Sequence, residues 1–282
     1  MKFSIAVVLL SGIIQLFLPS CMPQNTSSVE HNEPFITFSD STYSTIKNAF
    51  VKRNVDGCFI LYDVKRDTTL VYNPERTEEF FLPASTFKIP NSLIALECKV
   101  VRDVNEIIPW DGKERIVPAW NQDQTMRTAF RYSAVWFYQD LARRIGIDRM
   151  KKWVRKLNYG NNTVGPGIDD FWLVGDLRIT TRQQVDFLDR LLKSDLPAKK
   201  KNMATVRDIM IEESNQRYVL RGKTGWADFG TPVGWYVGWL EVGEQNFIFA
   251  MNMDIIEAGD QMYRKEIVNE VLNSIFQLNL TT

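Results

Sequence analysis

Hydrophobic residues follow a strand pattern near both ends of the chain and a helical pattern between them. Residues 57–62 and 69–72 are two apolar, β-rich runs separated by a polar turn, which predicts a hairpin. Three more β-rich runs lie near the C-terminus, at residues 217–220, 232–242 and 246–254. Tight turns are expected around Gly230 and Gly243. These runs predict one antiparallel sheet assembled from both chain ends.

The middle of the chain is rich in helix signals instead. Apolar residues recur at spacings of three and four over residues 134–145 and 150–157, as on one face of a helix. Thr181 and Gln184 form a capping-box pattern ahead of another apolar period, which predicts a helix start at that point. The sheet and these helices together predict a mixed α/β fold, with an all-helical lobe inserted between the strands.

The N-terminal segment differs in composition from the rest of the chain. Residues 1–21 contain a lysine, then a mostly apolar run, and end in Leu-Pro-Ser-Cys, which is typical of a secretory signal and too short for a membrane span. This ending resembles a bacterial lipoprotein box, so Cys21 is either lipidated or lost by simple cleavage. Residues 22–36 indicate a polar tether, and the mixed domain spans 37–282 with its helical lobe at roughly 97–200. We therefore expect export to the bacterial periplasm, with Cys21 as the candidate lipid anchor.

Composition excludes several function classes. The 282 residues are 45% hydrophobic, and 34 basic residues balance 34 acidic ones, which gives no electrostatic footprint for nucleic acid. The single histidine, His31, lies in the polar N-terminal segment, and the only cysteines are Cys21, Cys58 and Cys98. These numbers exclude a histidine-based or zinc-type metal site, so a serine hydrolase built on this chain needs a base other than histidine. Cys58 and Cys98 lie in apolar runs and are expected to be buried free thiols.

The stretch Ser85-Thr86-Phe87-Lys88 precedes an apolar, helix-compatible run. If Ser85 opens that helix, Lys88 follows one turn later on the same face. A serine hydroxyl is a poor nucleophile until a base takes its proton, and a buried lysine can be neutral near pH 7 and act as that base. The alternative is a helix start with an exposed lysine, because Ser-x-x-Lys occurs by chance in many helices.

Lys223-Thr224-Gly225 is the second informative stretch. Its Gly-Lys-Thr portion suggests a phosphate-binding loop, but that motif requires a glycine where this chain has Arg217, and strands rather than a long helix are expected to follow. On a strand, Lys223 offers a cation, Thr224 a hydroxyl, and Gly225 allows a ligand to lie close to the backbone. We therefore interpret the stretch as a substrate-binding wall, and its alternative is a hairpin turn.

Ser133-Ala134-Val135 is the third motif. Ser133 either passes a proton to a leaving group or simply caps the helix that follows. Ser-x-x-Lys, a serine-containing triplet and Lys-Thr-Gly, in this order along the chain, mark the β-lactamases and penicillin-binding proteins.

With these motifs, the chain resembles a class D, oxacillinase-type β-lactamase over essentially its whole mature length. Ser133-x-Val135 is similar to the triplet of that class, whose relatives carry a polar third residue. Two further stretches are similar to the class, Tyr159-Gly160-Asn161 and Phe171-Trp172-Leu173. The resemblance implies the fold of the penicillin-recognising serine transferases and hydrolases, and hydrolysis of β-lactam antibiotics.

The resemblance also implies how the reaction is catalysed. In this class the buried neutral lysine adds carbon dioxide and becomes a carbamate, here on Lys88, so carbon dioxide or bicarbonate is the only small molecule required besides the substrate. The carbamate serves as base twice, first for Ser85 and then for the water that hydrolyses the acyl-enzyme. Trp172 donates its indole N–H to the carbamate, or else is only a core aromatic. Val135 places no competing polar group near it.

The substrate contacts follow from the same resemblance. The oxyanion hole is formed by the backbone N–H groups of Ser85 and Trp226. Ser133 relays a proton to the leaving nitrogen. The substrate carboxylate is held by Lys223, Thr224 and Arg264. For Arg264 the alternative is an ordinary surface arginine.

Three other functions stay open from the sequence. A β-lactam sensor shares this fold but traps the acyl-enzyme, and a penicillin-binding protein that builds the cell wall uses the same serine. A lipoprotein with a decayed site would bind ligands without reacting at Ser85. Val135 favours the β-lactamase over the sensor, and covalent labelling of Ser85 separates the enzymes from the binding protein. Residues 112–128 and 226–232 are expected to control substrate access.

Overall fold

The structure, a computed structural model, describes residues 38–281. The predicted signal segment, the lipidation of Cys21 and the polar tether lie outside the described residues. Over residues 38–281, no helix is both long enough and apolar enough to cross a bilayer.

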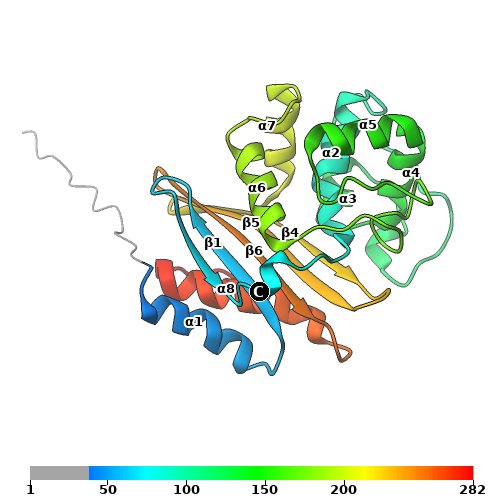
Figure 1. Cartoon of the computed structure of the whole chain (residues 1–282). Coiled ribbons are helices and arrows are strands. Elements are labelled where there is room, and N and C mark those ends of the chain that lie inside the picture. The colour runs from blue at the N-terminus through cyan, green and yellow to red at the C-terminus, as the bar shows by residue number, and fades with distance from the viewer. Residues whose placement is uncertain (1–37, 282) are drawn as a thin grey trace, which may run out of the picture. The chain divides into compact units, whose positions relative to one another are not determined.

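Six antiparallel strands form one sheet in the order β2-β1-β6-β5-β4-β3 (Figure 1). The strands are β1 (Gly57–Asp63), β2 (Thr68–Tyr72), β3 (Ile211–Ser214), β4 (Tyr218–Ala227), β5 (Val233–Val242) and β6 (Gln245–Asp254). The N-terminal strand β1 pairs with the C-terminal strand β6, with Leu61 opposite Phe249. The predicted sheet assembled from both chain ends is therefore confirmed.

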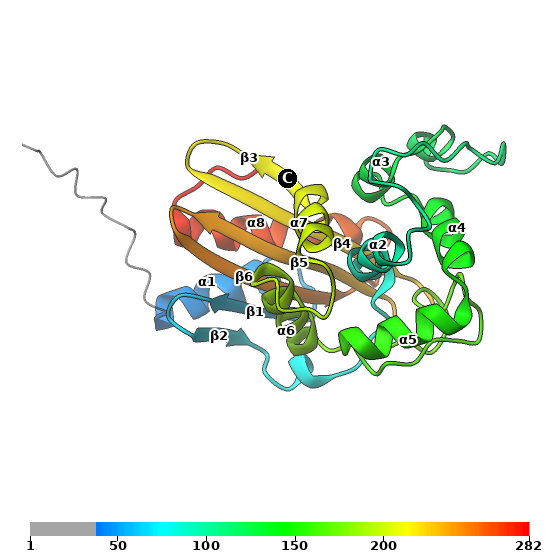
Figure 2. The ribbon, with the colours of Figure 1, turned by 90° about the horizontal axis from the view of Figure 1, so that it is seen from above.

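Helices cover both faces of this sheet. One face carries α1 and α8, and the helices of the middle of the chain lie on the other side (Figure 1). Seen from above, α6 lies across the strands β1, β5 and β6 (Figure 2). The helices are α1 (Asp40–Val51), α2 (Lys88–Glu97), α3 (Met126–Arg131), α4 (Val135–Ile145), α5 (Ile147–Leu157), α6 (Thr181–Leu192), α7 (Lys200–Ile209) and α8 (Tyr263–Phe276).

Because the sheet is covered on both faces, its central strands are apolar at nearly every position. Successive side chains of a strand point to opposite faces. In β6, Phe247 and Phe249 belong to the core cluster with α1 and α8. Ile248 and Ala250 belong to the cluster shared with the other helices. The β-rich run predicted over residues 246–254 lacks a polar face because of this double burial.

The capping box of α6 lies one residue earlier than predicted. The N-cap is Thr180, which is extended at φ −93° and ψ 163°, and its hydroxyl accepts a hydrogen bond from the backbone N–H of Gln183. Thr181 is already helical, so the prediction for Thr181 and Gln184 was wrong. Gln184 instead turns inward, where its Nε2 donates to Oγ1 of Thr86 at 2.8 Å.

The strand β4 is longer than the predicted run at residues 217–220. It continues to Ala227 and pairs with β5 throughout, with Lys223 opposite Val237. Lys223-Thr224-Gly225 therefore lies within a strand, and the alternative of a hairpin turn was wrong. The strand β3 was not predicted, because its four residues are mostly exposed and show no apolar alternation.

Cys58 and Cys98 are both free thiols, as predicted. Cys58 is fully buried, with Sγ 3.2 Å from Oγ1 of Thr181, and burial raises the pKa of its thiol to about 11. Cys98 is only half-buried, so the prediction of burial holds for one of the two residues.

Candidate active site

Ser85 and Lys88 lie side by side at the start of α2. Ser85 belongs to a short 3₁₀ helix, Ala84–Phe87, and α2 begins at Lys88. Residues three apart eclipse one another in a 3₁₀ helix. This geometry, rather than the α-helical start that was predicted, places Nζ of Lys88 2.7 Å from Oγ of Ser85 in a hydrogen bond.

The Lys88 side chain is completely buried, so the alternative of an exposed lysine was wrong. Its Nζ lies 5.4 Å from the centroid of the Tyr138 ring. Burial lowers the pKa of the Lys88 amine well below its ordinary value, and the positive charge of Lys223 acts in the same direction. Both effects favour the neutral amine, which is the form that can accept a proton.

Trp172 is fully buried beside the nucleophile turn, and its indole N–H has no hydrogen-bond partner among residues 38–281. Its backbone oxygen accepts from the N–H of Ala84 at 3.0 Å, and its ring stacks on Phe87 with centroids 5.4 Å apart. Leaving a buried donor unpaired costs about 1–3 kcal/mol. Such a donor therefore indicates that the site is built for an acceptor.

Gly225 allows β4 to pass close to the turn that carries Ser85. A Cβ atom at this position would lie 3.1 Å from the oxygen of Pro83 and 3.3 Å from the nitrogen of Thr86. The strand β3 pairs with residues 219–221 of β4, and in the part of the chain that the structure describes no strand pairs with the edge beyond them. Backbone groups of an unpaired edge are free to bind an extended ligand. Trp226, whose N–H was assigned to the oxyanion hole, lies on this part of β4 with its side chain about half exposed.

Lys223 is buried on β4, with 4% of its surface exposed. Its Nζ donates to the backbone oxygen of Thr224 at 3.0 Å and lies 5.6 Å from the centroid of the Phe130 ring. Burial lowers the pKa of this amine to about 7. Lys223 and Thr224 line one cavity, so a cation and a hydroxyl face the same space, as the predicted substrate wall requires.

Arg264, near the start of α8, is drawn into the same region. Its Nη1 donates to the backbone oxygen of Gly225 at 2.7 Å. The aliphatic part of the side chain packs on Gly234, where a Cβ atom would lie 2.9 Å from Cδ of Arg264. Burial lowers the pKa of this guanidinium to about 10. The alternative of an ordinary surface arginine was therefore wrong.

Ser133 lies between α3 and α4 and does not cap a helix. The N-cap of α4 is Ala134, with no side-chain capping bond, and Val135 is the first helical residue. Ser133 has a left-handed backbone with φ 58°, which is uncommon for serine and costs energy. Its backbone N–H donates to the oxygen of Phe130 at 3.2 Å, which ties it to the residue whose ring covers Lys223. Its hydroxyl makes no hydrogen bond to another candidate residue within 38–281.

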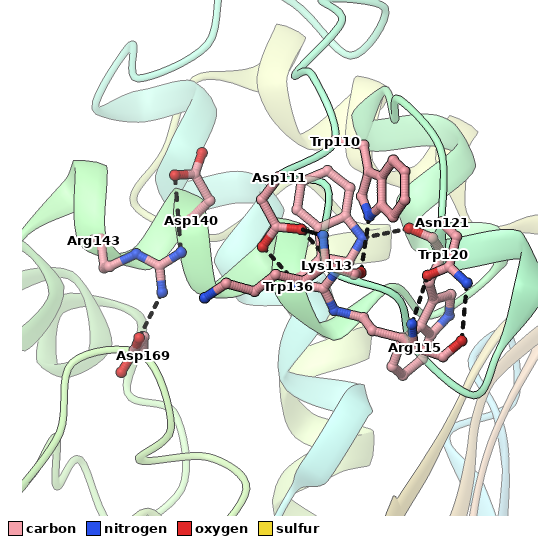
Figure 3. Close-up of polar contacts among 10 residues, drawn as sticks. All are labelled: Trp110, Asp111, Lys113, Arg115, Trp120, Asn121, Trp136, Asp140, Arg143 and Asp169. Carbon is pink, nitrogen blue, oxygen red and sulfur yellow. Dashed lines mark hydrogen bonds and ion pairs between the residues drawn. The ribbon is translucent and has the colours of Figure 1, made fainter.

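The segment expected to control access is held against the start of α4. Arg115 makes two hydrogen bonds to Asp111, at 2.8 and 2.7 Å, and its guanidinium lies 5.6 Å from the centroid of the Trp136 ring (Figure 3). The indole N–H of Trp136 donates to the backbone oxygen of Trp120, and that of Trp120 donates to the backbone oxygen of Tyr132. These contacts connect the access segment to the residues on either side of Ser133.

Two residues of this region escaped the sequence analysis. Tyr138 was taken as an apolar position of a helix, but its ring lies over Lys88 and its hydroxyl hydrogen-bonds Oγ of Ser92 at 2.9 Å. Ser92 in turn donates to the backbone oxygen of Lys88 at 2.7 Å. Ser92 follows Lys88 by four residues, which is the one sequence signal that places it on the same face of the helix.

Comparisons with known proteins point to one family. Residues 57–277 match the family model of the penicillin binding protein transpeptidase domain. The protein named "Probable beta-lactamase YbxI" of Bacillus subtilis (strain 168) is 43% identical over 202 residues, which cover 72% of this chain and 76% of that protein. Beta-lactamase OXA-48 of Klebsiella pneumoniae is 39% identical over 224 residues, which cover 79% of this chain and 84% of that protein.

Solved structures give the same result. The class D β-lactamase YbXI from Nostoc superposes with a TM-score of 0.80 at 43% identity, over 83% of this chain and 99% of that one. FUS-1 (OXA-85), a class D β-lactamase from Fusobacterium nucleatum subsp. polymorphum, gives a TM-score of 0.81 at 40% identity, over 84% and 99%. The chain belongs to the class D serine β-lactamases, and the resemblance stated from its motifs is confirmed.

Proposed function

We propose that this protein hydrolyses β-lactams through an acyl-enzyme on Ser85, with carbamylated Lys88 as the general base. The observation that carries the proposal is the contact between the two side chains, in which Nζ of a fully buried lysine lies 2.7 Å from Oγ of the serine. A base has to be within hydrogen-bond reach of the proton that it removes. A lysine can serve as base only when its amine is not protonated.

Two features of the site suit a carbon dioxide adduct on Lys88. The lowered pKa of the buried amine leaves its lone pair free to attack carbon dioxide, with loss of one proton from nitrogen. The adduct supplies an anionic oxygen base in an apolar site. The indole N–H of Trp172 offers that anion a hydrogen bond, which would satisfy a donor that has no partner within residues 38–281.

The roles of the residues follow from these positions. As Oγ of Ser85 attacks the lactam carbonyl, its proton passes to the base on Lys88. The protonated base reprotonates Ser133 as Ser133 gives its own proton to the departing nitrogen, so the base is free again. In the second half, the same base takes a proton from water, whose oxygen attacks the acyl carbon. The base then returns that proton to Oγ of Ser85 as the bond to the opened product breaks. The backbone N–H groups of Ser85 and Trp226 stabilise the negative oxygen in both halves. The substrate carboxylate is bound by Lys223, Thr224 and Arg264.

The test of this function combines turnover with detection of the adduct. We expect rapid hydrolysis of a penicillin, a faster rate when bicarbonate is added to degassed enzyme, and a carbamate signal in the carbon-13 spectrum taken in labelled bicarbonate near pH 7. The signal should be absent from Lys88→Ala. Rapid hydrolysis without an adduct would overturn the assignment of the base. An acyl-enzyme that persists in the unaltered protein would instead identify a sensor or a penicillin-binding protein.

A Trp172→Phe variant is expected to need about tenfold more bicarbonate for half-maximal activity, because a hydrogen bond to a charged group contributes about 1.5–3 kcal/mol. Its maximal rate at saturating bicarbonate should fall less than its rate without added bicarbonate. The thermal stability of the degassed variant should fall only by the packing that the smaller ring loses, since the lost donor has no partner among residues 38–281. The matched control is Trp153→Phe on α5, which should leave the bicarbonate requirement unchanged. If both variants needed the same bicarbonate concentration for half-maximal activity, the assignment of Trp172 as a donor to the carbamate would be wrong.

A further inference from the structure

A cavity of about 380 Å³ opens beside Lys223 and Thr224, away from the catalytic pair. Three cationic side chains line it, from Arg131, Lys223 and Lys265, and a single carboxylate, from Glu212 on β3. None of the motifs that define the active site includes Glu212. The cavity therefore contains one negative group whose role the proposed mechanism does not explain.

The carboxylate of Glu212 is fixed in place by contacts from β5 and α8. The hydroxyl of Tyr236 donates to Oε2 of Glu212 at 3.1 Å, and Nζ of Lys265 pairs with the same oxygen. Gly222 makes room for this arrangement, because a Cβ atom there would lie 2.6 Å from the Tyr236 ring and 3.1 Å from Oε1 of Glu212. The Glu212 carboxylate is held by two donors and occupies space that a Cβ atom at position 222 would take. It therefore has a defined position, unlike a mobile surface carboxylate.

The charges that face Lys223 are almost all positive. Arg131 is the last residue of α3, and Arg264 and Lys265 lie on α8. Lys88 on α2 is a neutral amine until it forms the carbamate. Tyr236 on β5 is neutral because burial raises the pKa of its phenol well above the ordinary value. Among the side chains of residues 38–281 before any carbamate forms, Glu212 is the one anion acting on Lys223. Burial, Arg264 and Lys265 lower the pKa of the Lys223 amine to about 7, and Glu212 opposes them.

We propose that Glu212 is a positioning residue for substrate binding, which keeps the positive charge on the Lys223 amine so that this amine can bind the carboxylate of the substrate. The inference rests on the proposed function, since it takes the substrate to be a β-lactam that carries a carboxylate. Glu212 does not touch that substrate. It acts through the field that its fixed carboxylate creates at Lys223, together with the Tyr236 and Lys265 contacts that hold it.

Glu212→Gln is the direct test, because it removes the charge and keeps the shape. Loss of the anion lowers the pKa of Lys223, and a decrease of one unit from about 7 reduces the charged fraction about fivefold near pH 7. We expect KM for a penicillin to rise about fivefold near pH 7, with a smaller change in kcat. The alkaline limb of kcat/KM should move to lower pH, and acidic buffer should restore the unaltered KM. The methyl ester of the same penicillin, which lacks the anion, should show no rise in KM.

Two further variants separate charge from general disturbance. Glu213→Gln is the matched control on the same strand, since Glu213 bonds Tyr218 and does not line the cavity, and its pH profile should equal that of the unaltered protein. Lys265→Gln removes a cation and should move the alkaline limb the opposite way, to higher pH. An unmoved limb in both Glu212→Gln and Lys265→Gln would overturn the inference.

Binding without turnover distinguishes failure of this inference from failure of the proposed function. In a Ser85→Ala background, calorimetry of penicillin binding near pH 7 should show about fivefold weaker binding when Glu212 is also changed to glutamine. Equal affinities with and without the Glu212 change would overturn the inference even if the enzyme hydrolyses penicillin. Weaker binding with no hydrolysis by the unaltered protein would overturn the proposed function and leave the role of Glu212 supported.

Discussion

A Ser85→Ala variant will not become acylated, and its turnover of a penicillin will fall by about 10⁴- to 10⁶-fold. The substitution removes the hydroxyl oxygen that lies 2.7 Å from Nζ of Lys88. The base on Lys88 then has no hydroxyl to deprotonate, and no acyl-enzyme can form at this position. Initial rates of hydrolysis measure the loss. The intact mass after incubation with penicillin shows directly whether the covalent adduct forms.

The control for this prediction is Ser41→Ala, an exposed serine on α1 far along the chain from the motifs. It should gain the mass of the penicillin and lose it again at the rate of the unaltered protein. Because alanine is smaller than serine by a single oxygen, the melting temperature of Ser85→Ala should stay close to that of the unaltered protein. A penicillin adduct on the Ser85→Ala protein would mean that the nucleophile is another residue.

The second large effect is expected from Lys88→Ala, in which the acyl-enzyme accumulates. Removing a general base lowers the rate of the step that it serves by about 10²- to 10⁴-fold. One base serves both halves of the proposed reaction, so acylation becomes slow and the hydrolysis of the adduct also becomes slow. Mass spectrometry after long incubation should find most of the protein carrying penicillin on Ser85. If deacylation kept most of its rate, Lys88 would not be the base that activates water.

Lys88→Met separates the loss of the base from the loss of packing, because methionine fills more of the space that alanine leaves empty. It should trap the acyl-enzyme as Lys88→Ala does. In bicarbonate-free buffer the lowered pKa of Lys88 in the folded protein means that unfolding takes up a proton. The free energy of unfolding of the unaltered protein should therefore decrease as the pH falls from the ordinary value of the amine towards neutrality. Thermal unfolding should show a smaller decrease in the methionine variant, because the lowered pKa of Lys223 still contributes its share, and the variant should be at least as stable near pH 7.

The fold was largely predictable because its strong signals are local. The hairpin at residues 57–62 and 69–72 became β1 and β2, with nearly the same bounds, since the two apolar runs and the polar turn lie within a few positions of one another. The short strand β3 lacks an apolar pattern and is stabilised by pairing with β4, so its own residues give no sequence signal that predicts a strand. The capping box failed by one residue because both Thr180 and Thr181 are followed three positions later by glutamine. Ile179 forms an antiparallel bridge with Phe81 directly before the helix, and Thr180 continues this extended backbone as the N-cap.

The candidate site divides in a similar way. The sequence by itself determined which chemical groups are present, because short motifs contain them. Ser85 supplies the nucleophile, Lys88 and Lys223 supply amines, and Gly225 allows a ligand to approach the backbone. It also predicted that Trp172 lies in the site, although only through resemblance to a family. The roles of these residues stay predictions until the variants are measured.

Only the tertiary structure decided whether that chemistry can work. The burial of Lys88 requires α4 and the aromatic residues around Phe87 to close over one amine, and these segments are far apart in the chain. The charge on Lys223 depends on Glu212, which a neighbouring strand brings into range. The spacing of residues within a motif can be read directly from the sequence. The desolvation of an ionisable group and the electric field at that group depend on all the atoms that surround it. Those surroundings exist only once the chain has folded.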